Sequence, residues 1–451
     1  MSEFPENFLN NIHSAAGFNA ETFIKAHDEN APVSIRINPK KNYCEFEKDA
    51  QVAWCENAMF LKERPVFTLD PLLHAGCYYV QEASSMFSGF AVQHCMDLNK
   101  PIKVLDLCAA PGGKSTDIIS ILSPESILVS NELVKQRVQI LKENMLKWGY
   151  ENEIITHNEA KHFSALPQYF DAILIDAPCS GSGLFRKDAH AMQHWNLNNL
   201  QMCSQRQEKI LEDVLPALKE NGILIYSTCS YSIEEDENIT DLLINKYGFQ
   251  SIAIPILADW NIIEVNTPAG GIGYRFYPDK VKGEGFYISV LRNTKAIENN
   301  QLYKTKESLI QDVTPTEKSI VSEWINDIAL HDFFKINNTI IALPKNILAE
   351  IKLLATKLLV LQSGIALGEI KGKDFIPAHA FAMSSLLKDT IPKFELDKQT
   401  ALQYLRKQEI QIEGDFTGWA IVCYKSIPLG WIKKLPNRIN NYYPAEYRIR
   451  M

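Results

Sequence analysis

The sequence lacks any long hydrophobic run. Its most apolar tract, residues 353–367, is interrupted by Lys357, Gln362 and Ser363, whereas a membrane-spanning helix needs about 20 consecutive, mostly apolar residues. The opening segment MSEFPENFLN also lacks the positive start and the apolar core of a secretory signal. We therefore predict a cytoplasmic protein that has no membrane partner.

Cysteine is scarce and is not spaced for disulfide bonds or zinc binding. The chain of 451 residues contains nine cysteines, none in a C-x-x-C pair, and its ten histidines, which include His74 and His379, form no zinc-ligand pattern. These absences argue against a disulfide scaffold and a zinc site. We expect free thiols and no metal. A lone free cysteine usually acts as a small buried apolar residue, but a cysteine in a small, polar turn is a candidate reagent.

The chain also lacks an overall positive charge. Its net charge of -8 argues against a uniformly basic surface for nucleic acid. The segment 431–450 differs, because it combines five bases with one acid and four aromatic residues: Lys433, Lys434, Arg438, Arg448 and Arg450, Glu446, and Trp431, Tyr442, Tyr443 and Tyr447. Such a mixture is typical of RNA-binding surfaces and equally of a solvated face.

The composition is that of an ordinary globular protein, with 46% hydrophobic and 22% charged residues. The length favours two or three domains. We predict an N-terminal domain at 1–98, a central domain at 99–293, a linker rich in Asn, Lys, Glu and Thr at 294–317, and a C-terminal domain at 318–451.

Short apolar runs alternate with helical patterns in the central domain. This alternation predicts a doubly wound α/β fold, in which helices cover both faces of a parallel sheet. One helix should place an apolar stripe on the sheet, formed by Val134, Val138, Leu141, Met145 and Trp148. Ligands bind at the carboxyl ends of the strands in such sheets. The residues directly after each run are therefore the candidates for a site.

The first run leads into a turn of small residues that lets a ligand approach the backbone closely. The turn consists of Cys108, Ala109, Ala110, Pro111, Gly112, Gly113 and Lys114. It is not an ATP-binding P-loop, since Cys108 stands where that motif has glycine, and it is not G-x-G-x-x-G. The second run ends at Glu132, where a ribose diol would bind, although such an acid is also a common helix-capping partner. A nucleoside site without a pyrophosphate motif points to S-adenosyl-L-methionine.

Two further runs end in cysteine-containing turns. Asp176 opens the segment DAPCSGSG, which contains Cys179, and the segment STCSY contains Cys229. Buried structural cysteines usually lie within an apolar run, whereas these two follow the ends of strands. Two such thiols beside a nucleoside pocket indicate covalent chemistry.

Methylation of cytosine at carbon 5 gives a thiol a function. This carbon is a poor nucleophile, and a thiolate that adds to carbon 6 activates it. Protonation or hydrogen bonding at N3 assists the addition, and Asp176 is placed to supply it if its pKa is raised. A base then removes the proton from carbon 5 and the thiol leaves. A free thiol has a pKa of about 8.5, so the attacking cysteine needs surroundings that favour its thiolate.

The motifs together resemble the Nop/Sun family of RNA cytosine-5 methyltransferases. The resemblance covers CAAPGGK at 108–114, Glu132, DAPCSGSG at 176–183 and STCSYSIEEDEN at 227–238. It extends upstream to SIRIN at 34–38 and YVQEASSM at 79–86, and downstream to GEIKGKDFIPAHA and PLGWIKK, which are similar to the RNA-binding extension of the bacterial 16S ribosomal RNA enzymes. The resemblance therefore covers most of the chain.

The resemblance implies roles for individual residues. Cys229 would be the nucleophile and Cys179 would help to release the product. Asp176 would line the cofactor pocket together with residues 108–114, Glu132 and Glu159, the acid that follows the third strand. DNA cytosine-5 enzymes attack with the Pro-Cys cysteine instead, so the presence of both motifs favours RNA.

The same resemblance implies the partners. These are S-adenosyl-L-methionine and RNA, foremost 16S ribosomal RNA or the small ribosomal subunit, with transfer RNA as the alternative. The N-terminal α+β domain would help to hold RNA, the C-terminal domain would be PUA-like, and the chain would act as a monomer. Arg186 and Lys187 are further candidates for phosphate contacts, although loop cations are usually just solvated.

Two other classes of protein compete with this interpretation. A non-catalytic ribosome-assembly factor would keep the fold for RNA binding, but it has no use for two thiols. A thiol hydrolase would need a histidine base and an oxyanion site beside Cys229, and the sequence shows no convincing Cys-His arrangement.

Overall fold

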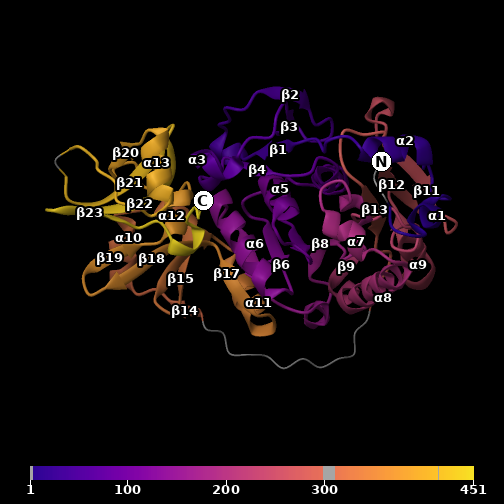
Figure 1. Cartoon of the computed structure of the whole chain (residues 1–451). Coiled ribbons are helices and arrows are strands. Elements are labelled where there is room, and N and C mark those ends of the chain that lie inside the picture. Colours follow the sequence, from indigo (N-terminus) through magenta and orange to yellow (C-terminus); the bar gives the residue numbers. More distant parts are fainter. Residues whose placement is uncertain (1–3, 298–309, 415, 451) are drawn as a thin grey trace.

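The computed structural model describes residues 4–297, 310–414 and 416–450. Figure 1 shows three neighbouring units: C-terminal elements in orange and yellow at the left, a central sheet covered by helices, and the N-terminal helices at the right. Among the described residues, no helix has the length and apolar character needed to cross a membrane.

A ten-stranded mixed sheet forms the centre, in the order β11-β12-β13-β9-β8-β5-β6-β7-β17, with β10 beside β13. Its parallel strands are β5 (Lys103–Asp106), β6 (Ile127–Asn131), β7 (Glu153–Thr156), β8 (Phe170–Asp176) and β9 (Leu218–Thr228). The antiparallel edge consists of β10 (Gln250–Ser251), β11 (Ile263–Asn266), β12 (Ile272–Phe276) and β13 (Phe286–Arg292). The predicted doubly wound fold is confirmed.

Helices cover both faces of this sheet, because alternate residues of each buried strand point to opposite faces. Val104 of β5 faces the core under α4 (Phe87–Cys95), α5 (Gly113–Ile121) and α6 (Lys135–Trp148). Leu105 faces the core under α8 (Leu197–Val214), α9 (Glu237–Tyr247) and α11 (Leu348–Lys357). A further short helix, α7 (Ala189–His194), precedes α8.

The predicted apolar stripe of α6 is correct at four of its five positions. Val138, Leu141, Met145 and Trp148 are buried, but Val134 is 46% exposed. The helix begins at Lys135, and Val134 has extended backbone angles just before it. Its side chain therefore leaves the helical stripe.

The N-terminal unit has two parts. Helices α1 (Phe8–Ile12) and α2 (Ala20–His27) pack through an aromatic cluster on the loops that follow β8 and β9. The second part is a four-stranded sheet in the order β2-β3-β1-β4, formed by β1 (Ser34–Ile37), β2 (Lys48–Gln51), β3 (Ala58–Leu61) and β4 (Tyr78–Val80). Along the chain, helix α3 (Pro71–His74) comes directly before β4, and α4 follows it. Since α4 contributes to the core of the central sheet, the central unit begins before the predicted boundary at residue 99.

The C-terminal unit contains two small sheets. One has the order β14-β15-β16-β18-β19 and consists of β14 (Ile310–Asp312), β15 (His331–Ile336), β16 (Thr339–Pro344), β18 (Ile365–Lys371) and β19 (Asp374–Pro377). The other contains β20 (Lys393–Glu395), β21 (Gly418–Tyr424), β22 (Ile427–Leu435) and β23 (Arg438–Asn441). Helices α10 (Pro315–Ser322), α12 (His379–Met383) and α13 (Lys398–Leu405) complete the unit.

The predicted linker is too long at its C-terminal end. Residues 310–312 form β14, which pairs with β15. Helix α10 starts after a capping box in which Thr314 and Glu317 each bind the backbone N–H of the other. Part of the predicted linker, residues 298–309, lies outside the described residues.

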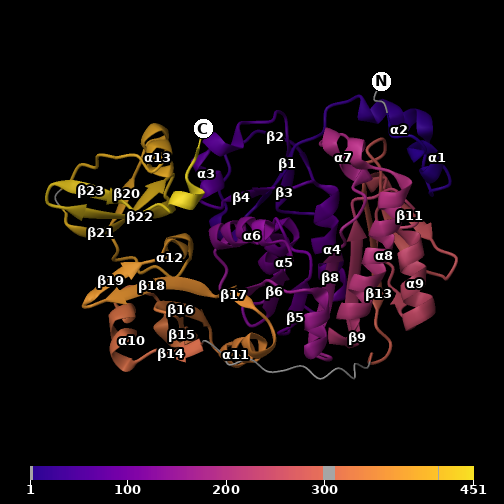
Figure 2. The same cartoon turned by 60° about the horizontal axis from the view of Figure 1, so that its bottom comes forward.

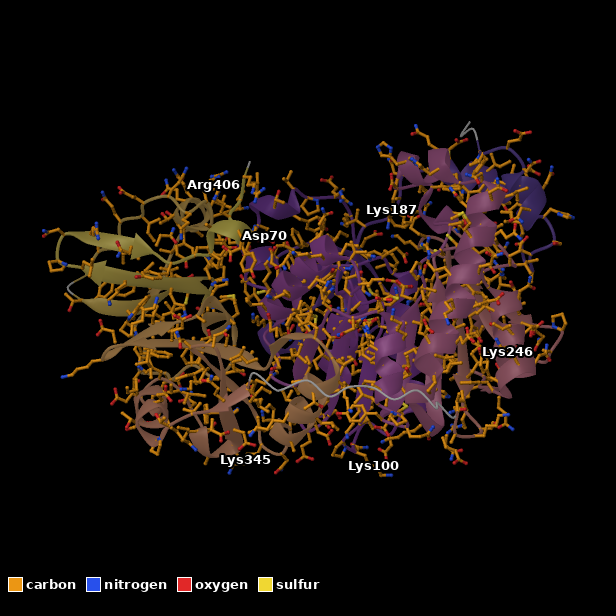
Figure 3. All side chains as sticks on the ribbon, turned by 90° about the horizontal axis from the view of Figure 1, so that it is seen from below. Asp70, Lys100, Lys187, Lys246, Lys345 and Arg406 are labelled. Carbon is orange, nitrogen blue, oxygen red and sulfur yellow. The ribbon has the colours of Figure 1, made fainter. Side chains whose placement is uncertain are left out.

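The C-terminal unit is attached to both other units. Strand β17 (Val360–Ser363) pairs with β7 and extends the central sheet; Figure 2 shows β17 between the C-terminal sheets and the central unit. Residues of α13 and β22 share a core with β1 and α3. Figure 3 places Asp70, the capping residue of α3, where the N-terminal and C-terminal units meet.

Candidate active site

A cavity of about 390 Å³ lies at the carboxyl ends of β5, β8 and β9. Its lining includes Cys108, Ala109, Ala110, Pro111, Gly113 and Lys114 from the turn after β5, together with Asp176 and Cys229. The N-terminal unit adds residues 79–82 and Ser85, and the start of β13 adds Phe286 together with the two residues before it, Glu284 and Gly285. The structure thus brings the predicted turn, the acid and one of the two cysteines to a single cavity.

Lys114 connects the small-residue turn with Asp176. Its ammonium lies 2.8 Å from Asp176 Oδ2, and Ser227 Oγ donates to Oδ1 of the same carboxylate at 3.0 Å. Burial alone would lower the pKa of Lys114, but Asp176, Asp106 and Cys229 raise it above its ordinary value. Lys114 therefore remains a cation at the centre of the site.

Asp106, at the end of β5, also lines the cavity. Oδ2 accepts a hydrogen bond from Ser115 Oγ at 2.7 Å, whereas the buried Oδ1 has no hydrogen-bond partner within the described structure. Burial raises the pKa of Asp106 to about 7. The unpartnered oxygen is suited to a polar ligand.

Glu132 ends up close to the cavity but does not line it. Oε1 accepts the backbone N–H of Val134 at 2.8 Å, and the Arg137 guanidinium lies 3.4 Å from the buried Oε2. Arg137 also donates to Ala110 O at 2.5 Å. One carboxylate oxygen of Glu132 therefore caps the start of α6, and the other lies behind the Arg137 side chain. Arg137 is half-exposed and does line the cavity.

The two cysteines lie side by side. Their Sγ atoms are 3.2 Å apart and both thiols are free, because the parallel neighbours β8 and β9 end together. Contact with Cys229 and burial raise the pKa of Cys179 well above its ordinary value. Cys179 therefore keeps its proton and can donate it to Cys229 Sγ, while Cys229 lines the cavity.

The loops that carry these cysteines fit closely together. Gly183 donates its N–H to Cys229 O at 2.8 Å, and Tyr231 N donates to Ser182 Oγ at 3.0 Å. A Cβ atom at Gly183 would lie 2.4 Å from Gly285 O and 2.8 Å from Cys229 O. Only glycine permits this approach.

Glu159 was predicted to line the cofactor pocket, and the structure places it elsewhere. Its side chain is 53% exposed and pairs with Lys161 at 2.7 Å. The preceding residue, Asn158, is buried, and its backbone N–H donates to Asn131 Oδ1 at 3.0 Å. The side chain at Glu159 therefore points away from the site.

Arg186 is not available for RNA phosphates. Its side chain is 5% exposed and binds the buried Glu284 through Nε at 3.1 Å and Nη2 at 3.0 Å. Lys187 remains partly exposed beside a groove that also contains Lys62, Arg64 and Lys282, and Figure 3 shows it near the N-terminal elements.

The basic, aromatic C-terminal segment is only partly on the surface. Trp431 and Tyr443 are buried and cannot stack on RNA. Tyr442 is 37% exposed and lies against Trp419, with ring centroids 4.4 Å apart, and Lys433 Nζ lies 5.2 Å from the Trp419 ring centre. Trp419 had not been singled out, because it lies outside the basic segment and reaches this face through pairing of β21 with β22.

His74 and His379 are core residues. Both are less than 10% exposed, and burial lowers the pKa values to about 4 and about 3 respectively. Among the described residues, no group of three or more His, Cys, Asp or Glu side chains is arranged to hold a metal ion.

Sequence reasoning missed Asp106, Arg137, Glu82 and Glu284 as residues of the site. Glu82 accepts the backbone N–H groups of Ser84 and Glu284, and so joins the N-terminal unit to the wall of the cavity. Asp106 was detectable, since it lies two residues before the turn, at the end of the first run. Glu82 lies in the segment YVQEASSM that carries the family resemblance, whereas nothing in the local sequence pattern signalled Arg137 or Glu284.

Comparisons with known proteins agree with this geometry. Three family descriptions match: 16S rRNA methyltransferase RsmB/F over residues 94–292, the N-terminal domain of 16S rRNA methyltransferase RsmF over residues 4–83, and the methyltransferase RsmF PUA domain over residues 391–449.

Similar proteins match along nearly the whole chain. Ribosomal RNA small subunit methyltransferase F of Aeromonas salmonicida (strain A449) is 29% identical, over 98% of this chain and 96% of that protein. The protein of the same name from Shewanella sp. (strain W3-18-1) is 28% identical, over 99% and 97%. The crystal structure of a methyltransferase homolog protein from Pyrococcus horikoshii is 27% identical with a TM-score of 0.54, and covers 64% of this chain and 95% of that one.

The fold and the cavity define an S-adenosylmethionine-dependent RNA methyltransferase. Within this class, residues 94–292 match the 16S rRNA methyltransferase RsmB/F family, and the flanking segments match the N-terminal and PUA domains of RsmF. The resemblance seen in the sequence is confirmed.

Proposed function

We propose that this enzyme methylates carbon 5 of cytosine in small-subunit ribosomal RNA, through a covalent bond between Cys229 and carbon 6. One observation carries the proposal: two thiols lie 3.2 Å apart, and Cys229 lines the same cavity as the small-residue turn. The names of the relatives, which specify small-subunit ribosomal RNA, support the choice of substrate.

The cavity fits S-adenosylmethionine. The turn at 108–114 has little side-chain bulk, and Asp106 Oδ1 and Glu132 Oε2 are buried oxygens without hydrogen-bond partners in the described structure. Residues 108–114, Asp106 and Asp176 would hold the cofactor, and Glu132 would join them once Arg137 moves aside. When bound, the cofactor supplies the methyl group.

In the proposed reaction, the Cys229 thiolate forms a bond to carbon 6 while a proton is delivered towards N3. The electron pair of the C5–C6 double bond thereby becomes available at carbon 5. Lys114 and Asp176 form the adjacent proton-transfer pair, since their ammonium and carboxylate are 2.8 Å apart. Lys114 is the member that carries a proton.

Release reverses the addition. After carbon 5 has gained the methyl group, a base removes its remaining proton, the C5–C6 double bond forms again and the bond to Cys229 breaks. Cys179 keeps its proton and lies in contact with Cys229. It is therefore placed to stabilise or protonate the departing thiolate.

Analysis of the modified nucleoside tests the proposal. The purified chain is incubated with methyl-labelled S-adenosylmethionine and, separately, with protein-free 16S ribosomal RNA, small ribosomal subunits and transfer RNA. The label should appear as 5-methylcytidine in a ribosomal sample. Another labelled nucleoside would overturn the chemistry, labelling of transfer RNA alone would overturn the substrate, and binding without transfer would favour the assembly factor.

A further inference from the structure

We propose that Glu235 is a positioning residue that holds Cys179 against Cys229 for release of the methylated product. The inference rests on the proposed function, because it assigns Glu235 to the release step. Glu235 lies six residues after Cys229, in the segment STCSYSIEEDEN. Its side chain reaches from the loop of one cysteine to the loop of the other.

Glu235 and its hydrogen-bond partner Gln207 bind the residues on either side of Cys179. Oε1 accepts the backbone N–H of Ser180 at 2.8 Å, and Oε2 accepts Ser180 Oγ at 2.6 Å. Gln207 Nε2 of α8 donates to Glu235 Oε1 at 3.2 Å and to Pro178 O at 3.1 Å. The residues on both sides of Cys179 are thus fixed by one buried network.

Burial protects the hydrogen bonds of this network from water. Glu235 and Gln207 have no exposed surface, so water cannot replace a hydrogen bond that is lost. The Sγ–Sγ distance of 3.2 Å depends on where the Cys179 loop is held. A looser loop would move the Cys179 thiol away from Cys229 without removing either thiol.

The neighbouring acids bind other partners. Glu234 accepts Asn11 Nδ2 at 2.9 Å. Asp236 accepts Thr228 Oγ1 at 2.6 Å, and Glu237 accepts Arg275 Nε at 2.6 Å. These three fasten the segment to α1, to the end of β9 and to β12, whereas Glu235 connects it to the Cys179 loop.

Glu235→Gln tests the assignment. Glutamine keeps the shape, and because the Ser180 hydroxyl can accept as well as donate, both contacts to Ser180 can still form, but as weaker hydrogen bonds to a neutral amide. If Glu235 positions Cys179, this variant should form the bond to RNA normally and break it slowly. The change from charge-assisted to neutral hydrogen bonds corresponds to roughly tenfold slower release. A protein–RNA adduct should then persist on denaturing gels, and kcat and KM should fall together while kcat/KM is unchanged.

Three variants accompany this experiment. Glu234→Gln makes the same chemical change one residue earlier and should retain no adduct. Ser180→Ala removes the Oγ–H that binds Glu235 and should retain an adduct, and it decides the question if Glu235→Gln does not fold. Cys179→Ala shows whether the release step can be blocked at all.

The outcomes separate the two proposals. If Cys179→Ala retains no adduct, the covalent mechanism of the proposed function fails. If Cys179→Ala retains an adduct while folded Glu235→Gln and Ser180→Ala retain none, the role of Glu235 is overturned and the covalent mechanism stands. Retention of equal adduct by Glu234→Gln would also overturn it, because the effect would then not depend on the Cys179 loop.

Discussion

At the scale of single residues, the reaction that the protein can catalyse depends on which side chains line the active-site cavity. The small-residue turn, Asp176, Cys179 and Cys229 were predictable from sequence, because parallel strands end at the same edge of the sheet. The direction in which a loop side chain points was not. Glu159 follows its strand as predicted but faces solvent, while Arg186 follows the Pro-Cys loop and is buried against Glu284.

Glu132 provides a test of the cofactor site. Glu132→Gln should lower S-adenosylmethionine affinity, because the neutral amide is a weaker acceptor for a ribose hydroxyl. The loss should be about tenfold, the scale of one hydrogen bond to a charged group. Calorimetry measures the affinity, and Glu159→Gln is the matched control that should leave it unchanged. Equal affinities of wild type and Glu132→Gln would remove Glu132 from the site.

Asp106 provides a pH-dependent test of stability. Burial raises its pKa to about 7 from its ordinary value of 3.8, so the folded state binds this proton more tightly than the unfolded state. Stability contributed by the neutral carboxyl is therefore lost as pH rises between these two values, and the loss is complete above the folded pKa. Asp106→Asn should remove this loss. Urea unfolding at pH 5 and pH 8 measures the free energy of unfolding, which should rise for the variant relative to wild type at the higher pH. A difference in unfolding free energy that is the same at both pH values would contradict the burial of a charged group.

At the scale of elements, the sequence predicted five parallel strands because their runs are apolar and short. It could not predict β17, whose residues follow α11 and pair with β7 across some 200 positions of sequence. The start of α10 could be predicted from the sequence, since Thr314 and Glu317 have the spacing of a capping box. Long-range pairing, by contrast, leaves no local pattern.

Asn158 is expected to hold β17 in place. Its Oδ1 accepts the N–H of Leu359 at 2.9 Å and its Nδ2 donates to Leu359 O at 3.2 Å. Asn158→Ala should cost about 1 kcal/mol, because the Leu359 N–H loses its acceptor while Leu359 O keeps the hydrogen bond from the His157 N–H. Hydrogen exchange at residues 359–363 should rise, whereas Glu159→Ala, an exposed neighbour, should leave it unchanged. Unchanged exchange in Asn158→Ala would show that strand pairing alone holds β17.

At the scale of the whole molecule, the three units share cores. The three units follow one another along the chain, but the C-terminal unit contributes β17 to the central sheet and packs on the N-terminal unit through α13. Removing the residues after 293 would therefore expose two cores rather than detach an RNA-binding module. Surface substitutions test RNA binding more cleanly.

Trp419 and Lys433 are the substitutions of choice. Trp419→Ala should weaken RNA binding by about tenfold, since stacking of one base contributes about 1–3 kcal/mol. Lys433→Gln should reduce the dependence of log affinity on log salt by about one unit, if it contacts one phosphate. Buried Tyr443→Phe is the control. Equal affinities of Trp419→Ala and the control would place the RNA elsewhere.

The central claim is that Cys229 attacks and Cys179 releases, and trapping of the RNA adduct tests it most directly. Wild type, Cys179→Ala, Cys229→Ala and the double variant are incubated with S-adenosylmethionine and small-subunit ribosomal RNA, then heated in detergent and separated on denaturing gels. We predict a persistent protein–RNA band for Cys179→Ala and none for Cys229→Ala or the double variant. A band for Cys229→Ala that disappears when Cys179 is also removed would contradict the account, because Cys179 would then be the nucleophile.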